Sequence, residues 1–324
     1  MSKLIRREFL KLTAAAGAAS ALPFESWAAD YPTRPVRLIV GFPAATATDV
    51  VARIIANALG PKLGQQVVVE NRPGAGSNIG AQTVARAAPD GYELLGMTIS
   101  NVVNATLYKD LSFDIVKDFE PIVATFKAPL VLVVSPNLGI KTVPELIAYA
   151  KAHPGKLNYA SFGNGSAPHI NGELFRMMTG TNMVHVPYRG NPVPDLLAGQ
   201  VQLMIAPIPV VVGQIRAGKL PALAVTSLES SAALPGVPPM AKYLPGYDTS
   251  IWHGIEAPKG TPKAIIDKLN TQINAVLADP AIKARFADNG GAPIGGTPAD
   301  LAALIASEKK KWAKVIEAAH ITAK

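Results

Sequence analysis

Two short segments of the chain carry small and hydroxyl-bearing residues where a strand pattern gives way to a helix pattern. The first follows the apolar run Val36–Val40 and contains Thr46-x-x-Asp49, which has the form of a capping box. That form predicts Thr46 as the N-cap, with its hydroxyl accepting the amide of Asp49. The amides of Ala47 and Thr48 then point out of the helix end. Free amides and the positive end of a helix dipole attract anions, so we interpret this segment as an anion-binding turn, with an ordinary strand–helix turn as the alternative.

The second segment repeats this arrangement more than a hundred residues later. Leu157–Ser161 is strand-like, Phe162–Gly165 is a glycine-rich loop, and helical spacing runs from Ser166 through Met178. Ser166 is a suitable N-cap, and a proline in the first turn is tolerated. This segment therefore also predicts free amides and hydroxyl groups ahead of a helix.

A pair of such segments predicts two lobes that share one cleft. A helix N-terminus stabilises an anion by roughly 0.3–2 kcal/mol, whereas micromolar affinity needs about 8 kcal/mol. One segment alone is therefore too weak. We expect two loops, several hydrogen bonds and closure of the lobes to act together.

The elements around these segments indicate an α/β fold. Strand-like runs and helical patterns alternate along the chain, which predicts largely parallel sheets. The strand-like runs are Val36–Val40, Gln66–Glu70, Glu93–Ser100, Leu130–Ser135, Leu157–Ser161, Met183–Pro187, Leu203–Ala206 and Leu220–Thr226. Asn101 directly follows one of them, at the carboxyl end where open α/β sheets bind ligands, so we include it in the candidate site.

A catalytic group is disfavoured by the sequence. Ser166, His169 and Glu173 lie within two helical turns, whereas the members of a triad normally come from separate segments, and the nucleophile elbow is missing. The remaining histidines are dispersed without metal-ligand spacing, and the chain has no cysteine. We predict a binding protein that is not an enzyme, with no metal and no cofactor.

Composition and the N-terminus indicate an exported globular protein. The chain has 324 residues, of which 49% are hydrophobic, and its net charge of +8 is scattered, so we expect no nucleic-acid partner. Residues 1–28 have a basic start, an apolar stretch and a small-residue cleavage site at Ala28, which is the pattern of a signal peptide. Arg6-Arg7 fits the twin-arginine form of that signal. No later run is long enough to span a membrane, so we predict a soluble periplasmic protein.

From Tyr31 almost to the C-terminus the chain resembles the Bug-type substrate-binding proteins of tripartite tricarboxylate transporters. The resemblance depends on the order of many short motifs. They are Tyr31-Pro32-x-Arg34-Pro35, Phe42 through Arg53, Glu70–Gly76, Ala88–Tyr92, Gly163-x-Gly165-Ser166-x-x-His169, His185–Gly190, Asp195-Leu196-Leu197-x-Gly199, Gly218-Lys219 and Trp252-x-Gly254.

The resemblance implies a type II periplasmic-binding-protein fold that closes on a small carboxylate. Residues 30–129 and 252–324 would form lobe one, and residues 130–251 lobe two. The ligand-binding residues it implies, together with those inferred above, are Phe42, Ala45, Thr46, Ala47, Thr48, Asp49, Asn101, Ser161, Gly163, Asn164, Gly165, Ser166, His169, Tyr188 and Ala206. The implied partners are the membrane permease subunits of the transporter, and we expect the protein to be a monomer.

Three departures from the family pattern bear on the ligand. Ala45-Thr46 replaces the usual glycine pair, so the first loop should adopt positive φ less readily. The segment between Gly190 and Asp195 is about two residues shorter than usual in the family. Ala206 stands where the family often has an aspartate that pairs with a ligand amine, which favours a dicarboxylate, tricarboxylate or aromatic acid over an amino acid. A ligand sensor for a signalling receptor and a periplasmic hydrolase remain alternatives.

Overall fold

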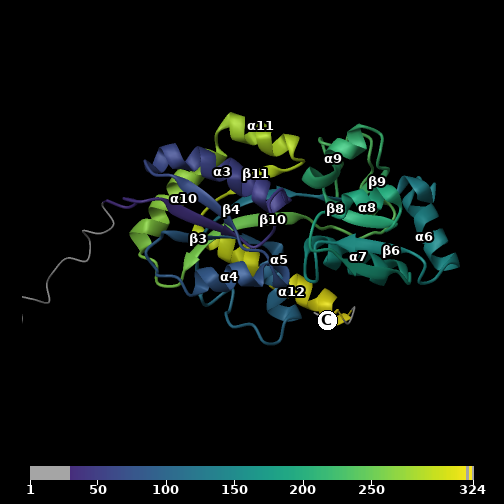
Figure 1. Ribbon diagram of the computed structural model, residues 1–324, viewed down its shortest axis with the longest axis horizontal. Coiled ribbons are helices and arrows are strands. Elements are labelled where there is room, and N and C mark those ends of the chain that lie inside the picture. Colours follow the sequence, from purple (N-terminus) through teal and green to yellow (C-terminus); the bar gives the residue numbers. More distant parts are fainter. Residues whose placement is uncertain (1–29, 319–320, 323–324) are drawn as a thin grey trace, which may run out of the picture.

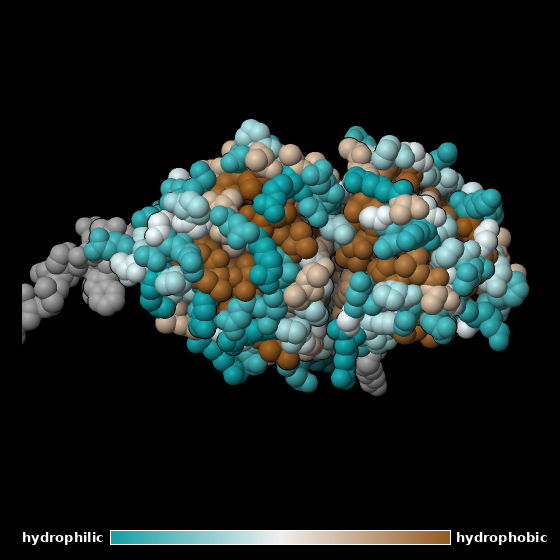
Figure 2. All heavy atoms as spheres, turned by 45° about the horizontal axis from the view of Figure 1, so that its top comes forward, coloured by the Kyte–Doolittle hydropathy of each residue, from teal (hydrophilic) through white to brown (hydrophobic). Residues whose placement is uncertain are grey.

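The computed structural model describes residues 30–318 and 321–322, and the chain forms two lobes, each built on its own β-sheet (Figure 1). The predicted export signal and its cleavage site at Ala28 lie outside the described residues. No helix within the described residues is long and apolar enough to cross a membrane. A groove separates the lobes on one face of the molecule, and hydrophobic residues lie on both sides of it (Figure 2).

The first lobe contains a six-stranded sheet with the strand order β11-β4-β10-β3-β1-β2. Its strands are β1 (Val36–Val40), β2 (Val67–Asn71), β3 (Glu93–Thr98), β4 (Phe119–Ala128), β10 (Ile251–Pro258) and β11 (Ala292–Gly295). Its helices are α3 (Ala47–Leu63), α4 (Asn78–Ala85), α5 (Ile99–Leu107), α10 (Lys263–Leu277), α11 (Pro280–Asp288) and α12 (Pro298–Ala318), with a 3-10 turn η1 at Ala75–Ser77. α3, α10 and α11 pack together in one helical layer, while α4, α5 and α12 form the other (Figure 1).

The second lobe contains a five-stranded sheet with the strand order β7-β6-β8-β5-β9. Its strands are β5 (Leu130–Val134), β6 (Asn158–Ser161), β7 (Val184–Pro187), β8 (Leu203–Pro207) and β9 (Ala222–Val225). Its helices are α6 (Val143–Ala152), α7 (Ala167–Thr179), α8 (Val193–Ala198) and α9 (Ile208–Arg216), with 3-10 turns η2 (Pro136–Leu138) and η3 (Met240–Lys242). β5 is buried on both faces, because Leu130, Leu132 and Val134 join one hydrophobic cluster and Val131 and Val133 another.

The expectation of largely parallel sheets is wrong, because both sheets are mixed. β1 pairs in parallel with β2 and β3, but β10 is antiparallel to both β3 and β4, and β11 is antiparallel to β4. In the second lobe β6 is parallel to β7 and β8, whereas β5 is antiparallel to β8 and β9. Four strands of the antiparallel pairs, β4, β5, β9 and β10, flank the two points at which the chain passes from one lobe to the other.

The two crossings between the lobes lie next to each other. The chain enters the second sheet between Ala128 and Leu130 and returns before Ile251, and Ile251 pairs with Ala128 across the first sheet. Thr226 ties the crossings together, because its hydroxyl accepts the amide of Leu130 at 2.9 Å and donates to the carbonyl of Thr249 at 2.8 Å. This hydroxyl holds both crossing segments at one place in the second lobe.

Several elements differ from those read off the sequence. The run Glu93–Ser100 ends as a strand at Thr98, and α5 begins immediately after it. The sequence did not predict α5, α9, β4, β10 or β11. The three strands among them account for the antiparallel pairs of the first sheet.

Candidate ligand-binding site

The first loop presents free helix amides, although the predicted capping box is wrong in its hydrogen bonds. Thr46 is the N-cap of α3 as predicted, but its hydroxyl donates backwards to the carbonyl of Pro43 at 2.8 Å. The first intrahelical bond runs from the amide of Val50 to the carbonyl of Thr46. The amides of Ala47, Thr48 and Asp49 therefore have no intrahelical acceptor.

The carboxylate of Asp49 holds the first loop in place through hydrogen bonds. One of its carboxylate oxygens accepts the amide of Ala45 at 2.9 Å, and the carboxylate also accepts from the side chains of Arg53 and Asn71. Asn71 in turn donates to the carbonyl of Phe42 at 3.0 Å. Burial works against ionisation of Asp49, but the hydrogen bonds from Arg53, Ala45 and Asn71 hold its pKa below the ordinary value. Asp49 thus fixes the loop and is itself paired.

Ala45 has a φ of 64°, in the left-handed region. Ala45 thus adopts positive φ although alanine does so less readily than glycine, and the bond from its amide to Asp49 explains how the conformation is held. A non-glycine residue in this region costs on the order of 1 kcal/mol.

The second loop has the same construction. Ser166 is the N-cap of α7, and its hydroxyl donates backwards to the carbonyl of Gly163 at 2.6 Å. The amide of Gly165 donates to Nδ1 of His169 at 3.0 Å, which matches the bond from Ala45 to Asp49 in position. In both loops the N-cap hydroxyl turns away from the helix, and a side chain of the first turn holds the residue before the N-cap. Both helices consequently leave first-turn amides open.

The two loops meet at a cavity between the lobes. The described residues that line it are Phe42, Thr46, Ala47, Thr48, Thr98, Ile99, Ser100, Phe162, Ser166, Ala167, Pro168, Pro207, Ile251 and His253. None of them is an acid, a lysine or an arginine. The space in the cavity that is open to water measures about 40 Å³, which is enough for a few water molecules.

Four helices begin at this cavity, two more than the sequence indicated. α5 starts after Thr98 and α9 after Pro207, and both of these cap residues line the cavity together with Thr46 and Ser166. Each of the four helices follows the carboxyl end of a strand, namely β1, β3, β6 or β8. Since a helix N-terminus carries a partial positive charge, four of them around an uncharged lining make the cavity suitable for an anion.

The structure brings part of the predicted site to the cavity wall and leaves the rest behind it. Phe42, Thr46, Ala47, Thr48 and Ser166 line the cavity. Ala45, Asp49, Asn101, Ser161, Gly163, Asn164, Gly165, His169, Tyr188 and Ala206 do not. The predicted site did not include the lining residues Thr98, Ile99, Ser100, Phe162, Ala167, Pro168, Pro207, Ile251 and His253. The polar strand end at Thr98 and the proline at the end of β8 are nevertheless recognisable helix-start signals.

Three of the predicted site residues that do not line the cavity have defined structural roles. Asn101 is completely buried and caps α5, since its Oδ1 accepts the amide of Thr98 and its Nδ2 donates to Ser77. Tyr188 donates its hydroxyl to Asp195 at 2.8 Å. Ala206 is buried in the core of the second lobe. Asn101 therefore supports the site from inside the first lobe.

His169 and His185 stack on each other beneath the second loop, with His169 buried and His185 half-buried. Their rings lie 4.0 Å apart at 18°, and His185 also stacks on Tyr159. Burial lowers the pKa of His169 to about 4 and that of His185 to about 3, so both are neutral at neutral pH. The His185 ring also hydrogen-bonds the Ser161 hydroxyl at 2.6 Å, but Ser161 is completely buried.

The Ser166, His169 and Glu173 group is not connected as a catalytic triad. The Ser166 hydroxyl is bonded to the carbonyl of Gly163, while Glu173 accepts from the hydroxyl of Tyr159 and pairs with Arg176. Within the described residues, no three histidine or acidic side chains gather in a way that suits a metal ion. The arrangement suits binding better than nucleophilic chemistry.

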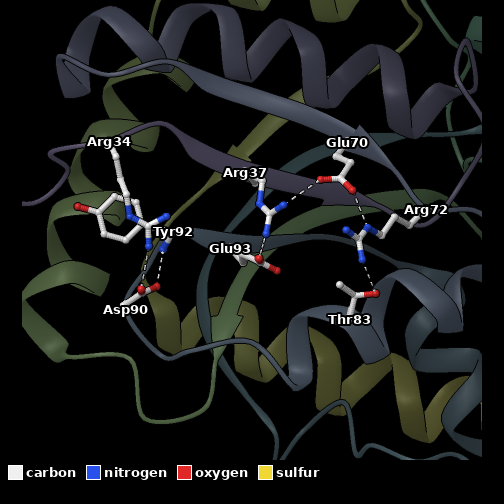
Figure 3. Close-up of polar contacts among 8 residues, drawn as sticks. All are labelled: Arg34, Arg37, Glu70, Arg72, Thr83, Asp90, Tyr92 and Glu93. Carbon is white, nitrogen blue, oxygen red and sulfur yellow. Dashed lines mark hydrogen bonds and ion pairs between the residues drawn. The ribbon is translucent and has the colours of Figure 1, made fainter.

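Charged side chains near the first strands are paired with one another. Arg37, near the start of β1, contacts Glu93 at the start of β3 and Glu70 of β2, and Arg72 also pairs with Glu70 (Figure 3). Arg37 and Glu93 stand at the ends of their strands opposite the cavity, which follows the carboxyl ends of β1 and β3. Among the described residues that line the cavity, the polar groups are backbone amides, hydroxyl groups and one histidine.

Two α/β lobes with a cavity between them are the architecture of a solute-binding protein. The sequence model of the tripartite tricarboxylate transporter family receptor matches residues 51–321. The chain belongs to this family, and it is of the Bug type.

Solved structures of the family superpose closely on this chain. The periplasmic binding protein BugD is 37% identical, with a TM-score of 0.85 over 90% of this chain and 99% of BugD. R. palustris Rpa4515, solved with adipate, is 35% identical with a TM-score of 0.87 over 90% of this chain and 99% of its own. MatC from Rhodopseudomonas palustris, solved with bound malate, is 31% identical with a TM-score of 0.84 over 88% of this chain and 100% of its own. These similarities confirm the family resemblance and the two-lobed α/β fold.

Proposed function

We propose that the protein captures a small carboxylate between its lobes in the periplasm and delivers it to the membrane permease of a tripartite tricarboxylate transporter. The observation that carries this proposal is the matched pair of helix N-termini, at Ala47 and Ala167, that line one cavity from opposite lobes. Adipate and malate in the two R. palustris relatives support a carboxylate as the ligand class. The small cavity implies that the lobes separate to admit a ligand.

The chemistry of the lining favours an acid over an amino acid. A buried ammonium group needs a carboxylate partner, and none of the described lining residues is acidic. Ala206 lies behind the wall, and Pro207, which follows it, offers no charge. Dicarboxylates, tricarboxylates and aromatic acids fit this lining better than cationic ligands.

A binding role without catalysis is favoured by how the polar groups are used. The hydroxyl groups of Thr46 and Ser166 are committed to backbone carbonyls, and the serine that meets a histidine, Ser161, is buried away from the cavity. A nucleophile needs both a base and access to the substrate. We therefore propose that the bound acid is released unchanged.

We further propose that the lobes close about the two adjacent crossings held by Thr226, with lobe boundaries at residues 129/130 and 251/252. They lie close to the points at which the chain changes sheets, which are before Leu130 and before Ile251. We retain the twin-arginine signal as the route of export, with cleavage after Ala28.

A thermal-shift screen of the mature protein tests this function. Ligands at a hundred times their dissociation constant stabilise the folded state by about 2.7 kcal/mol. The screen compares mono-, di- and tricarboxylates, aromatic acids and amino acids. We expect stabilisation by one class of acids. Stabilisation by amino acids alone would contradict the argument from the lining, and no response to any acid would contradict the proposed function.

A further inference from the structure

His253 is the one titratable side chain among the described residues that line the cavity. It stands in β10, which belongs to the first lobe, and its ring stacks on Phe126 with centroids 5.5 Å apart. Only 5% of the residue is exposed.

The hydrogen-bonding capacity of this ring is largely unused by the protein. Its Nε2 lies 3.4 Å from the hydroxyl oxygen of Thr48, which is a long contact, and its buried Nδ1 has no hydrogen-bond partner within the described part of the chain. A neutral imidazole has one donor and one acceptor nitrogen, and a hydroxyl group can serve as either. Thr48 also lines the cavity, so the two side chains offer a donor and an acceptor next to the ligand space.

The surroundings keep this pair uncharged. Burial lowers the pKa of His253 to about 3, so the ring is neutral at neutral pH. Asp49, the residue after Thr48, is bonded to Arg53 and Asn71, and the pKa of Glu256, three residues further along β10, is raised by burial. The helix N-termini therefore supply the positive potential in the cavity, and Thr48 with His253 supplies a neutral polar contact.

We propose that Thr48 and His253 form a specificity-determining pair that hydrogen-bonds an uncharged oxygen of the ligand, a hydroxyl or carbonyl group, while the helix N-termini hold its carboxylate. This inference rests on the proposed function. A site built to hydrogen-bond such a group discriminates against the analogue without it, because its own buried polar atoms are then left unpaired.

Calorimetric titration with matched acids tests the inference. The pairs are malate with succinate, lactate with propionate, and 4-hydroxybenzoate with benzoate. We expect the wild type to bind the hydroxy acid of a pair about tenfold more tightly, which corresponds to about one hydrogen bond. In His253→Phe and in Thr48→Val the hydroxy acid should lose this advantage, so that the two acids of a pair bind with affinities within about threefold of each other.

The exposed His153, which stacks on Tyr149 outside the cavity, provides a matched control. His153→Phe should leave both affinities unchanged. A wild type without preference, a preference that persists in both variants, or an equal loss for both acids of a pair would overturn the inference but leave the proposed function intact. Failure of the wild type to bind any acid would overturn both. The preference should also be independent of pH between 6 and 8, and tighter binding at lower pH would show that His253 is charged in the complex, against the inference.

Discussion

The amide of Ala45 donates to a carboxylate oxygen of Asp49 across 2.9 Å, although Ala45 is in the left-handed region of backbone space. In the other lobe the amide of Gly165 makes the equivalent bond to His169, from a glycine with a φ of 79°. The two loops are therefore built alike, but only the first one carries the cost of a Cβ atom at this position. This difference leads to a direct prediction about stability.

Ala45→Gly should raise the free energy of unfolding by up to about 1 kcal/mol. The substitution relieves the left-handed strain, and the greater flexibility of glycine in the unfolded chain offsets part of the gain. Denaturant unfolding measures the change. Ala47→Gly is the matched control, because it lies in the first turn of α3 and should lower the stability by about 0.5–1 kcal/mol. Equal destabilisation by both variants would contradict the strain at Ala45.

Gly165→Ala should impair closure of the lobes. A Cβ atom at Gly165 would lie 2.1 Å from Oδ1 of Asn104 in the first lobe, so the second loop and α5 cannot keep their contact. We expect weaker ligand binding and a loss of ligand-induced compaction in small-angle scattering. Gly180→Ala is the control, since Gly180 has a φ of 63° but no atom within 4 Å of its Cβ position. Equivalent behaviour of the two variants would mean that strain alone explains the effect.

Stability should fall as the pH drops from about 6.5 towards 4. The pKa of His169 is about 4 and those of His185 and His253 are about 3, all lowered by burial, so in this range the unfolded chain takes up protons that the folded protein does not. Each histidine contributes a slope of about 1.4 kcal/mol per pH unit. In His185→Gln, the free energy of unfolding measured from denaturation curves should depend correspondingly less on pH. The exposed His153→Gln should keep the wild-type slope, and a reduced slope in that variant would argue against burial as the cause.

The buried carboxyl group of Glu256 should make the folded state less stable as the pH rises, which is opposite to the effect of the histidines. Both of its carboxylate oxygens are buried without a hydrogen-bond partner in the described residues, and burial raises its pKa well above the ordinary value. The folded state therefore favours the protonated acid, and stability declines by about 1.4 kcal/mol per pH unit above 4.5 until the folded pKa is reached. Glu256→Gln should unfold at a higher denaturant concentration than the wild type at pH 8, with little difference at pH 4.5. Destabilisation at pH 8 would show that the carboxylate has a compensating partner.

The location of the site follows from local patterns in the sequence. Thr46 and Ser166 are the N-caps that the small-residue loops predict, because a hydroxyl residue between a strand pattern and a helix pattern marks a helix start. The direction of their hydroxyl groups was not predictable, since it depends on the turn that brings the carbonyls of Pro43 and Gly163 back towards them.

Other parts of the site depend on long-range contacts. The β-branched residues Ile99, Val102 and Val103 suit a strand as well as a helix, and the cap at Thr98 decides in favour of α5. Thr48 and His253 are 205 residues apart in sequence and meet because β10 inserts between β3 and β4. Strand order is a tertiary property, so the local periodicity of the sequence does not predict it.

In the proposed complex, the first-turn amides of α3 and α7 hold the ligand carboxylate from opposite lobes. Ala47 and Ala167 are the first residues of these helices, where proline is tolerated but removes the amide hydrogen. Hydrogen bonds to a charged group contribute about 1.5–3 kcal/mol, so Ala47→Pro and Ala167→Pro should each weaken binding of the acid selected by the thermal-shift screen at least tenfold. Lys263→Pro, at the first position of α10 and outside the cavity lining, serves as the control.

Isothermal titration of these three variants and the wild type with that acid is the most direct measurement. If both helix N-termini hold the carboxylate, Lys263→Pro should keep the wild-type affinity. Ala47→Pro and Ala167→Pro should then lose affinity to a similar, large extent. Unchanged affinity in both alanine variants, with the folded state intact, would contradict this mode of binding.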